Sequence, residues 1–157
     1  MTYFIGVDPG KNGAFSVVDE NSRLQDYWRM GQLFDMRIKM LPYLEDLGIL
    51  AIEKASAMRA QGRQQGAKGM FTYGKGYGML LGMFETLKIN YAEIHPKTWM
   101  TKMFGTGTEK GQSKENGIKL AKAMHPDHTF IPARCKKIHD GVTDATCIAH
   151  YARRYLQ

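Results

Sequence analysis

The pattern of apolar and polar positions predicts three strands at the start of the chain. Two apolar, β-prone runs, 3–7 and 14–18, flank a tight turn rich in proline, glycine and asparagine, and they predict a hairpin. The segment 23–30 predicts a third strand with Leu24 and Trp28 as its buried anchors. Because the connections are short, we expect the three strands to form an antiparallel meander.

The pattern then changes to a helix and back to a strand. Apolar residues recur at helical spacing across 32–47, and they predict a helix with a kink or break at Pro42 and an end at Gly48. The continuously apolar run 49–52 predicts a short central strand that is covered on both faces.

A longer helix is predicted over 70–87, although it contains several glycines. Three of them recur every fourth residue and fall on one face of the helix: Gly74, Gly78 and Gly82. Each lowers helix stability by about 1 kcal/mol relative to alanine. We therefore expect another helix or the sheet to approach this face closely. Met70 and Phe71 are interpreted as core residues, with apolar wedges between stacked bases as the alternative.

The second half of the chain predicts one more strand and three helices. Residues 89–94 alternate as a strand, and Pro96 suits the first turn of a short helix. Ser113 is positioned to cap a helix that ends before Pro126. The last helix begins near Asp140 and is apolar along one side.

Four acidic residues stand where an isolated charge is unfavourable. Asp8 and Glu53 each end an apolar strand, and a buried carboxylate destabilises a fold unless it is paired. Asp140 and Asp144 lie one helical turn apart and repel each other. A divalent cation would relieve both conflicts. The alternatives are an ordinary turn aspartate at position 8 and a solvated pair of aspartates in the last helix.

The chain is strongly basic, with a formal net charge of +7 and a sequence pI near 9.4. This balance favours an anionic partner, with nucleic acid first and a membrane surface second, although no basic amphipathic helix stands out. The segment 54–69 carries Lys54, Arg59, Arg63 and Lys68. A basic loop beside an active site suits a phosphate backbone, and a solvated surface loop is the alternative.

Length and composition predict one domain spanning 1–157, with enough of its residues hydrophobic, 43%, to build a core. The start of the chain has no signal-peptide pattern, and no apolar run is long enough to span a bilayer. Cys135 and Cys147 are too few and wrongly spaced for a zinc site or a disulfide framework, so we interpret them as reduced thiols.

The chemistry of the acids indicates a nuclease. Hard oxygen ligands favour Mg²⁺, with Mn²⁺ as a substitute, over zinc. Two such ions roughly 4 Å apart can activate a water and stabilise a leaving oxygen in phosphodiester cleavage. Carboxylates beneath a basic surface therefore predict a metal-dependent nuclease with two ions in each active site.

At this point the chain resembles the RuvC-type Holliday-junction resolvases, in the compact form found in phages. The stretches that carry the resemblance keep the family order and cover nearly the whole chain: IGVDPGKNGAFSVV, LAIEKA, YGKGYGMLLG, HPKTW, KGQSKENGIKLAKAMHP and HDGVTDATCIAHYARR. The resemblance implies an RNase H-like α/β fold, with a mixed sheet of about five strands, the first three antiparallel, and helices on both faces. It also implies a homodimer in a bacterial or phage-infected cytoplasm that cuts four-way DNA junctions symmetrically and leaves 5′-phosphate ends.

The resemblance also assigns roles to individual residues. Three acids match the family's metal ligands: Asp8, Glu53 and Asp144. Many members carry an acid or a histidine three residues before the last of these, where this chain has Gly141. We therefore assign the fourth position to Asp140 and keep His139 as a rival ligand or proton-transfer group. Lys114 matches the family lysine that binds the cleaved phosphate or stabilises its developing charge.

Two family features have no direct match. Met100 takes the place of a second family lysine, for which Lys97 or Lys102 can substitute, and Ser56 and Met58 occupy the region of an aromatic wedge. Further phosphate contacts are expected from other basic residues: Lys75, Arg134, Lys136 and Lys137.

Other functions fit part of the pattern. A nuclease of broad specificity would cut branched DNA in general or RNA/DNA hybrids, and a junction-binding module would hold DNA without cutting it. The segment GVDPGKNG is also similar to the phosphate-binding hairpin of sugar-kinase-like ATPases. The chain is short for their duplicated domains, and its basic charge suits DNA better.

Overall fold

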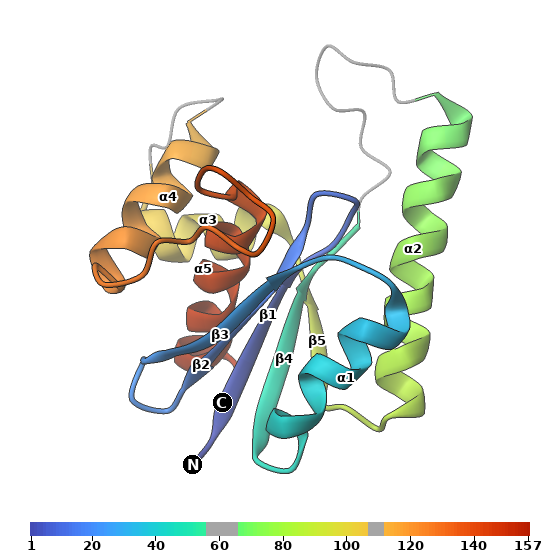
Figure 1. The fold of residues 1–157 in the computed structure, drawn as a ribbon, viewed down its shortest axis with the longest axis horizontal. Coiled ribbons are helices and arrows are strands. Elements are labelled where there is room, and N and C mark those ends of the chain that lie inside the picture. The colour runs from blue at the N-terminus through green and yellow to red at the C-terminus, as the bar shows by residue number, and fades with distance from the viewer. Residues whose placement is uncertain (56–65, 107–111) are drawn as a thin grey trace.

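The computed structural model describes residues 1–55, 66–106 and 112–157 of the chain. The strands are β1 (Tyr3–Asp8), β2 (Ala14–Asp19), β3 (Leu24–Arg29), β4 (Leu47–Glu53) and β5 (Tyr91–Ile94). The helices are α1 (Leu33–Leu44), α2 (Ala67–Thr86), α3 (Pro96–Phe104), α4 (Ser113–Met124) and α5 (Asp140–Tyr155). Over these residues the strands form one mixed sheet in the order β3-β2-β1-β4-β5, with helices on both faces (Figure 1), as predicted.

The first three strands form the predicted antiparallel meander. β1 pairs with β2 and β2 with β3 in antiparallel register, whereas β4 pairs in parallel with β1 and β5 in parallel with β4. Leu24 and Trp28 on β3 are 7% and 3% exposed, which confirms them as its apolar anchors. Because β1 and β4 are parallel neighbours, their carboxyl ends lie at the same edge of the sheet.

The side chains of β1 alternate between two cores. Ile5 packs in the core that α1 and α2 complete, and Phe4 packs in the core that α3, α4 and α5 complete. Gly6 faces α5 at close range, because a Cβ there would overlap the backbone oxygen of Ala145. By the same alternation, Asp8 points to the face that α5 covers.

Helix α5 forms the centre of the core on its face. Every residue from Gly141 to Ala152 except Asp144 is buried, and the helix packs against β1, β2 and β4. His150 and His125 share a hydrogen bond of 2.8 Å between their Nε2 atoms, which joins α5 to the end of α4. Because so many neighbours hold α5, the position of its first turn relative to β1 is well defined.

Helix α1 corrects one predicted boundary. It ends at Leu44, and Pro42 lies within its last turn, two residues before the end. Proline has no backbone N–H to donate, so the helix loses one hydrogen bond close to its end. The prediction that Gly48 ends the helix is wrong, because Gly48 lies inside β4. A Cβ at Gly48 would come within 2.9 Å of the Phe4 ring, so close packing explains the glycine.

Helix α2 corrects two predictions. The three glycines at four-residue spacing face open space, since a Cβ at any of them would have no neighbour within 4 Å: Gly74, Gly78 and Gly82. The prediction that another helix or the sheet approaches this face closely is therefore wrong for the described residues. Met70 and Phe71 are 45% and 73% exposed, so the core prediction is wrong for both. The cause is geometric, because the buried residues of α2 (Leu80, Met83 and Phe84) all lie in its second half.

The remaining helices largely follow the sequence pattern. Pro96 opens α3, and α5 begins at Asp140, as predicted. Ser113 does not cap α4, because it is already the first helical residue and Gln112 occupies the cap position. Strand β5 begins two residues later than predicted, at Tyr91. Among the described helices, none combines the length and the apolarity needed to cross a bilayer.

Candidate active site

The carboxyl ends of β1 and β4 bring two of the predicted acids to one edge of the sheet. β1 ends at Asp8 and β4 ends at Glu53. The strands are parallel with Val7 opposite Ile52, so the next residue of each strand is the acid. Because paired residues of neighbouring strands point to the same face, both carboxylates project to the face of the sheet that α3, α4 and α5 cover.

Helix α5 brings the other two acids to the same edge. Asp140 is its first residue, and Asp144 lies one turn further along. The start of the helix is pressed against the β1–β2 turn, because a Cβ at Gly141 would overlap the Asn12 carbonyl oxygen and lie 3.1 Å from Asp8 Oδ2. A side chain has no room at position 141, and position 140 carries the acid instead.

The charges of the neighbouring acids act on Asp8 and on Asp144. Burial raises the pKa of Asp8 well above its usual range, and the charges of Glu53, Asp144 and Asp140 raise it further. Burial, followed by the charges of Glu53 and Asp140, raises the pKa of Asp144 to about 7. Burial also raises the pKa of Glu53. The fold therefore assembles all four acids that the sequence singled out.

A cavity of about 310 Å³, here called the acid cavity, lies between the β1–β2 turn and the start of α5. Its polar lining consists of Asp8, Asn12, Lys114, His139, Asp140 and Asp144. Glu53 does not line the cavity, although its charge acts on both Asp8 and Asp144. The cavity thus joins three acids, one lysine and one histidine in a single space.

The donor set suits a hard divalent cation. Carboxylate oxygens are the preferred ligands of Mg²⁺ and Mn²⁺, and a cation would relieve the repulsion among the buried acids. Among the residues that the structure describes, no group of three or more His, Cys, Asp or Glu side chains is arranged to hold a metal ion. Two of the four carboxylates are instead engaged by neighbouring side chains.

Glu53 is held by Trp99 of α3. The indole Nε1–H donates a hydrogen bond of 2.7 Å to Glu53 Oε2, and this bond lowers the pKa of Glu53 against the larger effect of burial. The Trp99 side chain is fully buried, with its ring edge-on to Phe104. A rigid donor of this kind fixes the orientation of the carboxylate. We did not identify Trp99 from the sequence as a site residue, although it stands in the HPKTW stretch.

Asp140 is engaged by Lys114 of α4. Lys114 Nζ lies 2.7 Å from Asp140 Oδ2, and the ammonium holds the pKa of Asp140 below its usual range. The two side chains are 73% and 37% exposed. Exposed ion pairs contribute little to stability, so either partner can change its contact at small cost. The two aspartates of α5 therefore differ, because Asp140 pairs directly with Lys114, whereas the pKa of Asp144 is raised in spite of the more distant charge of that lysine.

His139 caps the start of α5. Its Nδ1 accepts a hydrogen bond of 3.3 Å from the Val142 backbone N–H, while the ring lines the acid cavity. Burial and the charge of Arg29 lower its pKa. The cap assigns His139 a structural role, and its predicted role as a rival ligand stays a prediction.

Helix α4 closes over Asp144. A Cβ at Gly117 would overlap Asp144 Oδ1, so only glycine leaves space for the carboxylate at this contact. The neighbouring Cys147 thiol is buried and contacts the Gly117 carbonyl oxygen at 3.9 Å. A glycine inside a predicted helix gives no sequence signal for this role, because its partner lies 27 residues away in another helix.

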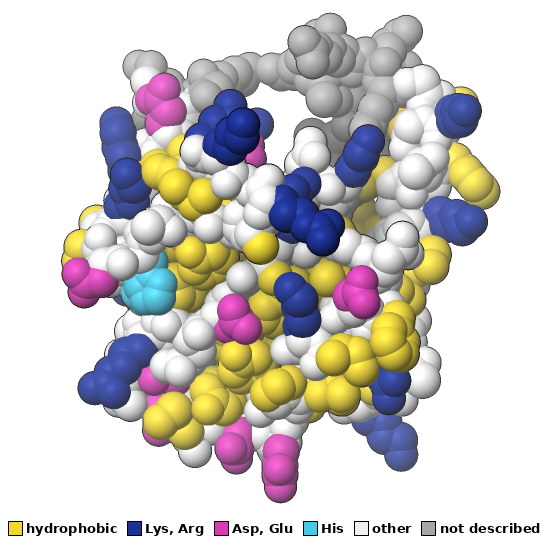
Figure 2. Space-filling model, viewed as in Figure 1, with side chains coloured by type: hydrophobic (Ala, Val, Ile, Leu, Met, Phe, Trp, Pro, Cys, Tyr) yellow, Lys and Arg dark blue, Asp and Glu magenta, His cyan; other side chains and the backbone are white. Residues whose placement is uncertain are grey.

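The predicted DNA-contacting residues that the structure describes are all exposed: Lys54, Lys68, Lys75, Lys97, Lys102, Arg134, Lys136 and Lys137. Arg59 and Arg63 lie outside the described residues, as do Ser56 and Met58. On the face of the molecule drawn in Figure 2, basic side chains are spread over the region where β1 and β4 end. Lys102 instead lies over the ring of Tyr155, the last residue of α5, at the far end of that helix from Asp140.

A mixed sheet of this topology, with α5 across its antiparallel strands, defines the RNase H-like class of folds. The chain is similar in fold to Thermus thermophilus RuvC, with a TM-score of 0.61 and 16% sequence identity over 97% of this chain and 96% of that chain. A structure of T. thermophilus RuvC in complex with Holliday junction substrate matches with a TM-score of 0.61 and 14% identity over 99% and 97% of the two chains. Neither a scan of protein-family models nor a search of curated proteins finds a match. At these identities, the likeness is one of fold.

Proposed function

We propose that this protein is a metal-dependent endodeoxyribonuclease that resolves Holliday junctions and other branched DNA by paired symmetric nicks. The observation that carries the proposal is the meeting of four carboxylates from β1, β4 and α5 at one edge of the sheet. The shared fold supports it, because T. thermophilus RuvC is known in complex with a Holliday junction substrate. The net charge of +7 also suits a polyanionic substrate.

The four acids would have different roles in metal binding. Asp8, Glu53 and Asp144 would hold the divalent cations, and Asp140 would complete the set once it leaves Lys114, with His139 as its rival. Two Mg²⁺ ions, or Mn²⁺ in their place, would activate a water for in-line attack and stabilise the leaving 3′ oxygen, which leaves a 5′-phosphate end. Trp99 keeps Glu53 in position for this task through its 2.7 Å hydrogen bond.

Lys114 would change partners when DNA binds. Its ammonium pairs with Asp140 in the free protein, and it lines the same cavity as Asp8 and Asp144. A DNA phosphate in that cavity would accept charge-assisted hydrogen bonds from the ammonium, and the exposed ion pair with Asp140 costs little to break. The exchange would place a positive charge on the phosphate and release Asp140 toward the metal.

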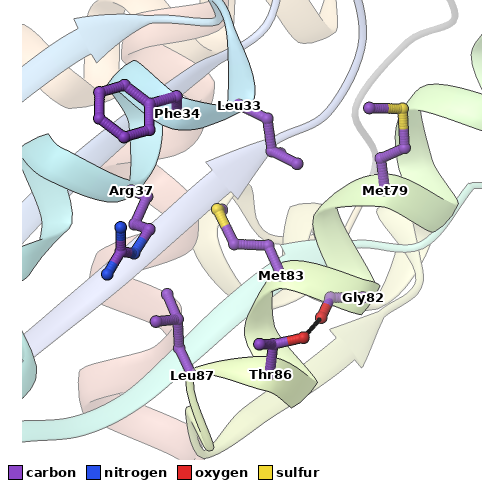
Figure 3. Close-up of a pocket in the computed structure, with 8 residues that line it drawn as sticks. All are labelled: Leu33, Phe34, Arg37, Met79, Gly82, Met83, Thr86 and Leu87. Atoms are coloured by element: carbon purple, nitrogen blue, oxygen red, sulfur yellow. Dashed lines mark hydrogen bonds between the residues drawn. The ribbon is translucent and has the colours of Figure 1, made fainter.

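A symmetric pair of nicks requires two active sites, so we propose a homodimer. We define the α1–α2 face by four exposed apolar side chains: Phe34, Ile38 and Leu41 on α1, and Met79 on α2. Between the helices lies a groove of about 560 Å³, into which Leu33, Met83 and Leu87 project (Figure 3). Figure 2 shows hydrophobic side chains gathered over this part of the surface. Exposed apolar patches of this kind mark interaction sites.

A cleavage assay tests the proposal directly. Wild-type protein should nick a synthetic four-way junction at symmetric positions in Mg²⁺ or Mn²⁺ and leave it whole in EDTA. Asp8→Asn should abolish cutting yet still bind the junction, because the phosphate contacts come from basic residues elsewhere. Asp127→Asn, an exposed acid outside the acid cavity, is the matched control. An Asp8→Asn protein that still cuts would overturn the metal assignment.

The substrate range is decided in the same assay. Three-way junctions, flaps and RNA/DNA hybrids separate a junction resolvase from a broader nuclease, and binding without cutting in any divalent ion would identify a junction-binding module. Binding should weaken steeply as salt rises. The single domain over 1–157, the compact phage-like type and the cytoplasmic location stay predictions.

A further inference from the structure

A second cleft lies on the other side of the β1–β2 turn from the acid cavity. It has a volume of about 850 Å³, and we call it the tyrosine cleft. Its walls are the tip of the turn at Gly10 and Lys11, the connection from β3 to α1, and the first half of α2. The same turn supplies Asn12 and Gly13 to the acid cavity. The two spaces therefore share one wall only a few residues thick.

Two aromatic rings of α2 line the tyrosine cleft. Tyr73 and Tyr77 are one helical turn apart and fall on the same face of the helix. The Tyr77 hydroxyl donates a hydrogen bond of 2.6 Å to Glu93 Oε2, which fixes that ring. The Tyr73 ring packs on the turn, because a Cβ at Gly10 would lie 3.3 Å from its Cε2. Both rings are half-buried, so each keeps a surface for a ligand.

Tyr73 connects the cleft to the acids. Burial, and then the charges of Glu53 and Asp8, raise the pKa of its phenol to about 12. The hydroxyl therefore stays protonated at neutral pH and lies within electrostatic reach of both carboxylates. Its ring also lies against the turn at Gly10, two residues after Asp8.

Two lysines give the tyrosine cleft its charge. Lys11 and Lys68 are exposed side chains of its lining, on opposite walls. Aromatic faces flanked by cations bind the bases and phosphates of single-stranded nucleic acid, and the volume lies within the usual range for ligand sites. A purely apolar occupant, such as a partner helix, would cover both ammonium groups without pairing them.

We infer that the tyrosine cleft binds one unstacked nucleotide of the DNA strand whose phosphate lies in the acid cavity. The inference rests on the proposed function, and it adds that the strand is held by its base as well as by its backbone. A nucleotide beside the branch point of a junction has lost part of its stacking, so extruding it costs less than in a continuous duplex. The rings of Tyr73 and Tyr77 would replace the lost stacking, and Lys11 and Lys68 would contact the flanking phosphates.

The first test measures binding of a fluorescein-labelled oligothymidylate by anisotropy, without divalent ions. Tyr73→Ala should weaken binding about tenfold, whereas Tyr73→Phe should stay within about twofold because it keeps the ring. Tyr43→Ala removes a half-buried tyrosine of α1 that lines neither the tyrosine cleft nor the acid cavity, and it is the matched control. Circular dichroism melts establish that each variant is folded. Equal affinities for Tyr73→Ala and wild type would overturn the inference.

The second test locates the base. Four-way junctions carrying 5-iododeoxyuridine at single positions around the cut site are irradiated with the wild-type protein in EDTA, and crosslinked peptides are identified by mass spectrometry. One position next to the cut should crosslink to Tyr73 or Tyr77, and Tyr73→Ala should lose most of that product. Crosslinks that avoid α2 at every position would exclude the cleft.

The two proposals fail separately. If wild-type protein cuts junctions in Mg²⁺ but neither test involves Tyr73, the nuclease assignment stands and the cleft assignment is wrong. If junctions stay whole in every divalent ion but oligothymidylate binding depends on the Tyr73 ring, the cleft is a nucleotide site and the catalytic proposal is wrong.

Discussion

The two layers of helices that cover the sheet differ in how closely they pack. On the α5 face, helix and sheet approach so closely that a Cβ at Gly6 would overlap the backbone of α5, and Gly117 and Gly141 are equally confined. On the α1–α2 face, a Cβ at Gly78 would meet nothing within 4 Å, and Phe34 is 66% exposed. The α5 layer is closed within the described chain, and the outer side of the α1–α2 layer leaves apolar side chains exposed, as the proposed dimer would require.

The difference matches the roles that we propose for the two layers. Four like charges can be held near one another only if the surrounding structure cannot relax, and close packing of α5 on β1 supplies that rigidity. A surface for association needs accessible apolar area and room for another backbone. Glycines therefore serve opposite ends in this molecule. At Gly6, Gly117 and Gly141 the missing side chain lets a neighbouring element approach, whereas the glycines at positions 74, 78 and 82 of α2 face open space.

The largest expected effect comes from breaking the closed face. Gly6→Ala should lower the free energy of unfolding by about 3 kcal/mol or more, because both colliding groups are backbone atoms that cannot rotate away. Gly78→Ala on the open face should instead stabilise the monomer by roughly 0.5–1 kcal/mol, through higher helix propensity. Urea denaturation at low protein concentration measures both. Equal effects of the two substitutions would erase the contrast between the faces.

A smaller effect should come from removing one charge on the closed face. Asp144→Asn should raise the free energy of unfolding in EDTA at pH 8 by about 2 kcal/mol, since the native state disfavours the charged form. The sign follows from a folded pKa of about 7, above the unfolded value of 3.8. The native state then holds an extra proton, so the stability from this group is complete below pH 4 and is lost as the pH rises through 7. Between pH 5 and 8, the melting temperature should therefore fall less steeply with rising pH in the variant than in wild type.

Added Mg²⁺ distinguishes a metal site from simple repulsion in the same experiment. It should raise the melting temperature of wild type and raise that of Asp144→Asn less, because the variant has lost a ligand. Asp127→Asn should behave as wild type in both arms. If Asp144→Asn destabilised the protein in EDTA at pH 8, the electrostatic account of the site would be wrong.

The smallest expected effect concerns the open face. Phe34→Arg places a charge on the α1–α2 face and should weaken self-association at least about tenfold, or roughly 1.4 kcal/mol, while the melting temperature of the monomer changes little. Sedimentation velocity over a range of concentrations measures this. Ile131→Arg, at a 39% exposed apolar residue outside that face, is the matched control. A dimer that tolerates Phe34→Arg must use another surface.

The local pattern of the chain predicted most of its elements, and the errors are informative. The hairpin around Asp8, the strand that ends at Glu53 and the helix that begins at Asp140 were all predicted, because strand alternation and helix periodicity are local properties. Met70 and Phe71 were misplaced because periodicity identifies an apolar side of a helix but not whether anything covers it. The misreading of the α2 glycines has the same cause, since burial depends on neighbours distant in sequence.

The acids show the same division within the site. Their residue types and places at strand and helix ends were visible in the sequence, and the resemblance to a nuclease family grouped them before any distance was known. The sequence did not predict three contacts of the site: the hydrogen bond from Trp99 to Glu53, the ion pair of Lys114 with Asp140, and the packing of Tyr73 against the β1–β2 turn. Each of these contacts joins elements far apart in the sequence, and each depends on how the helices pack.

The sequence by itself therefore determined which elements form and which chemical groups stand at their ends, because backbone propensity and side-chain chemistry act locally. Only the tertiary structure decided that β1, β4 and α5 converge at one edge, that α2 extends beyond the sheet, and that two cavities share the β1–β2 turn. The physical reason is that convergence depends on the depth and angle at which elements pack. Those quantities are set by contacts across the whole chain, as in the meeting of Gly6 with Ala145.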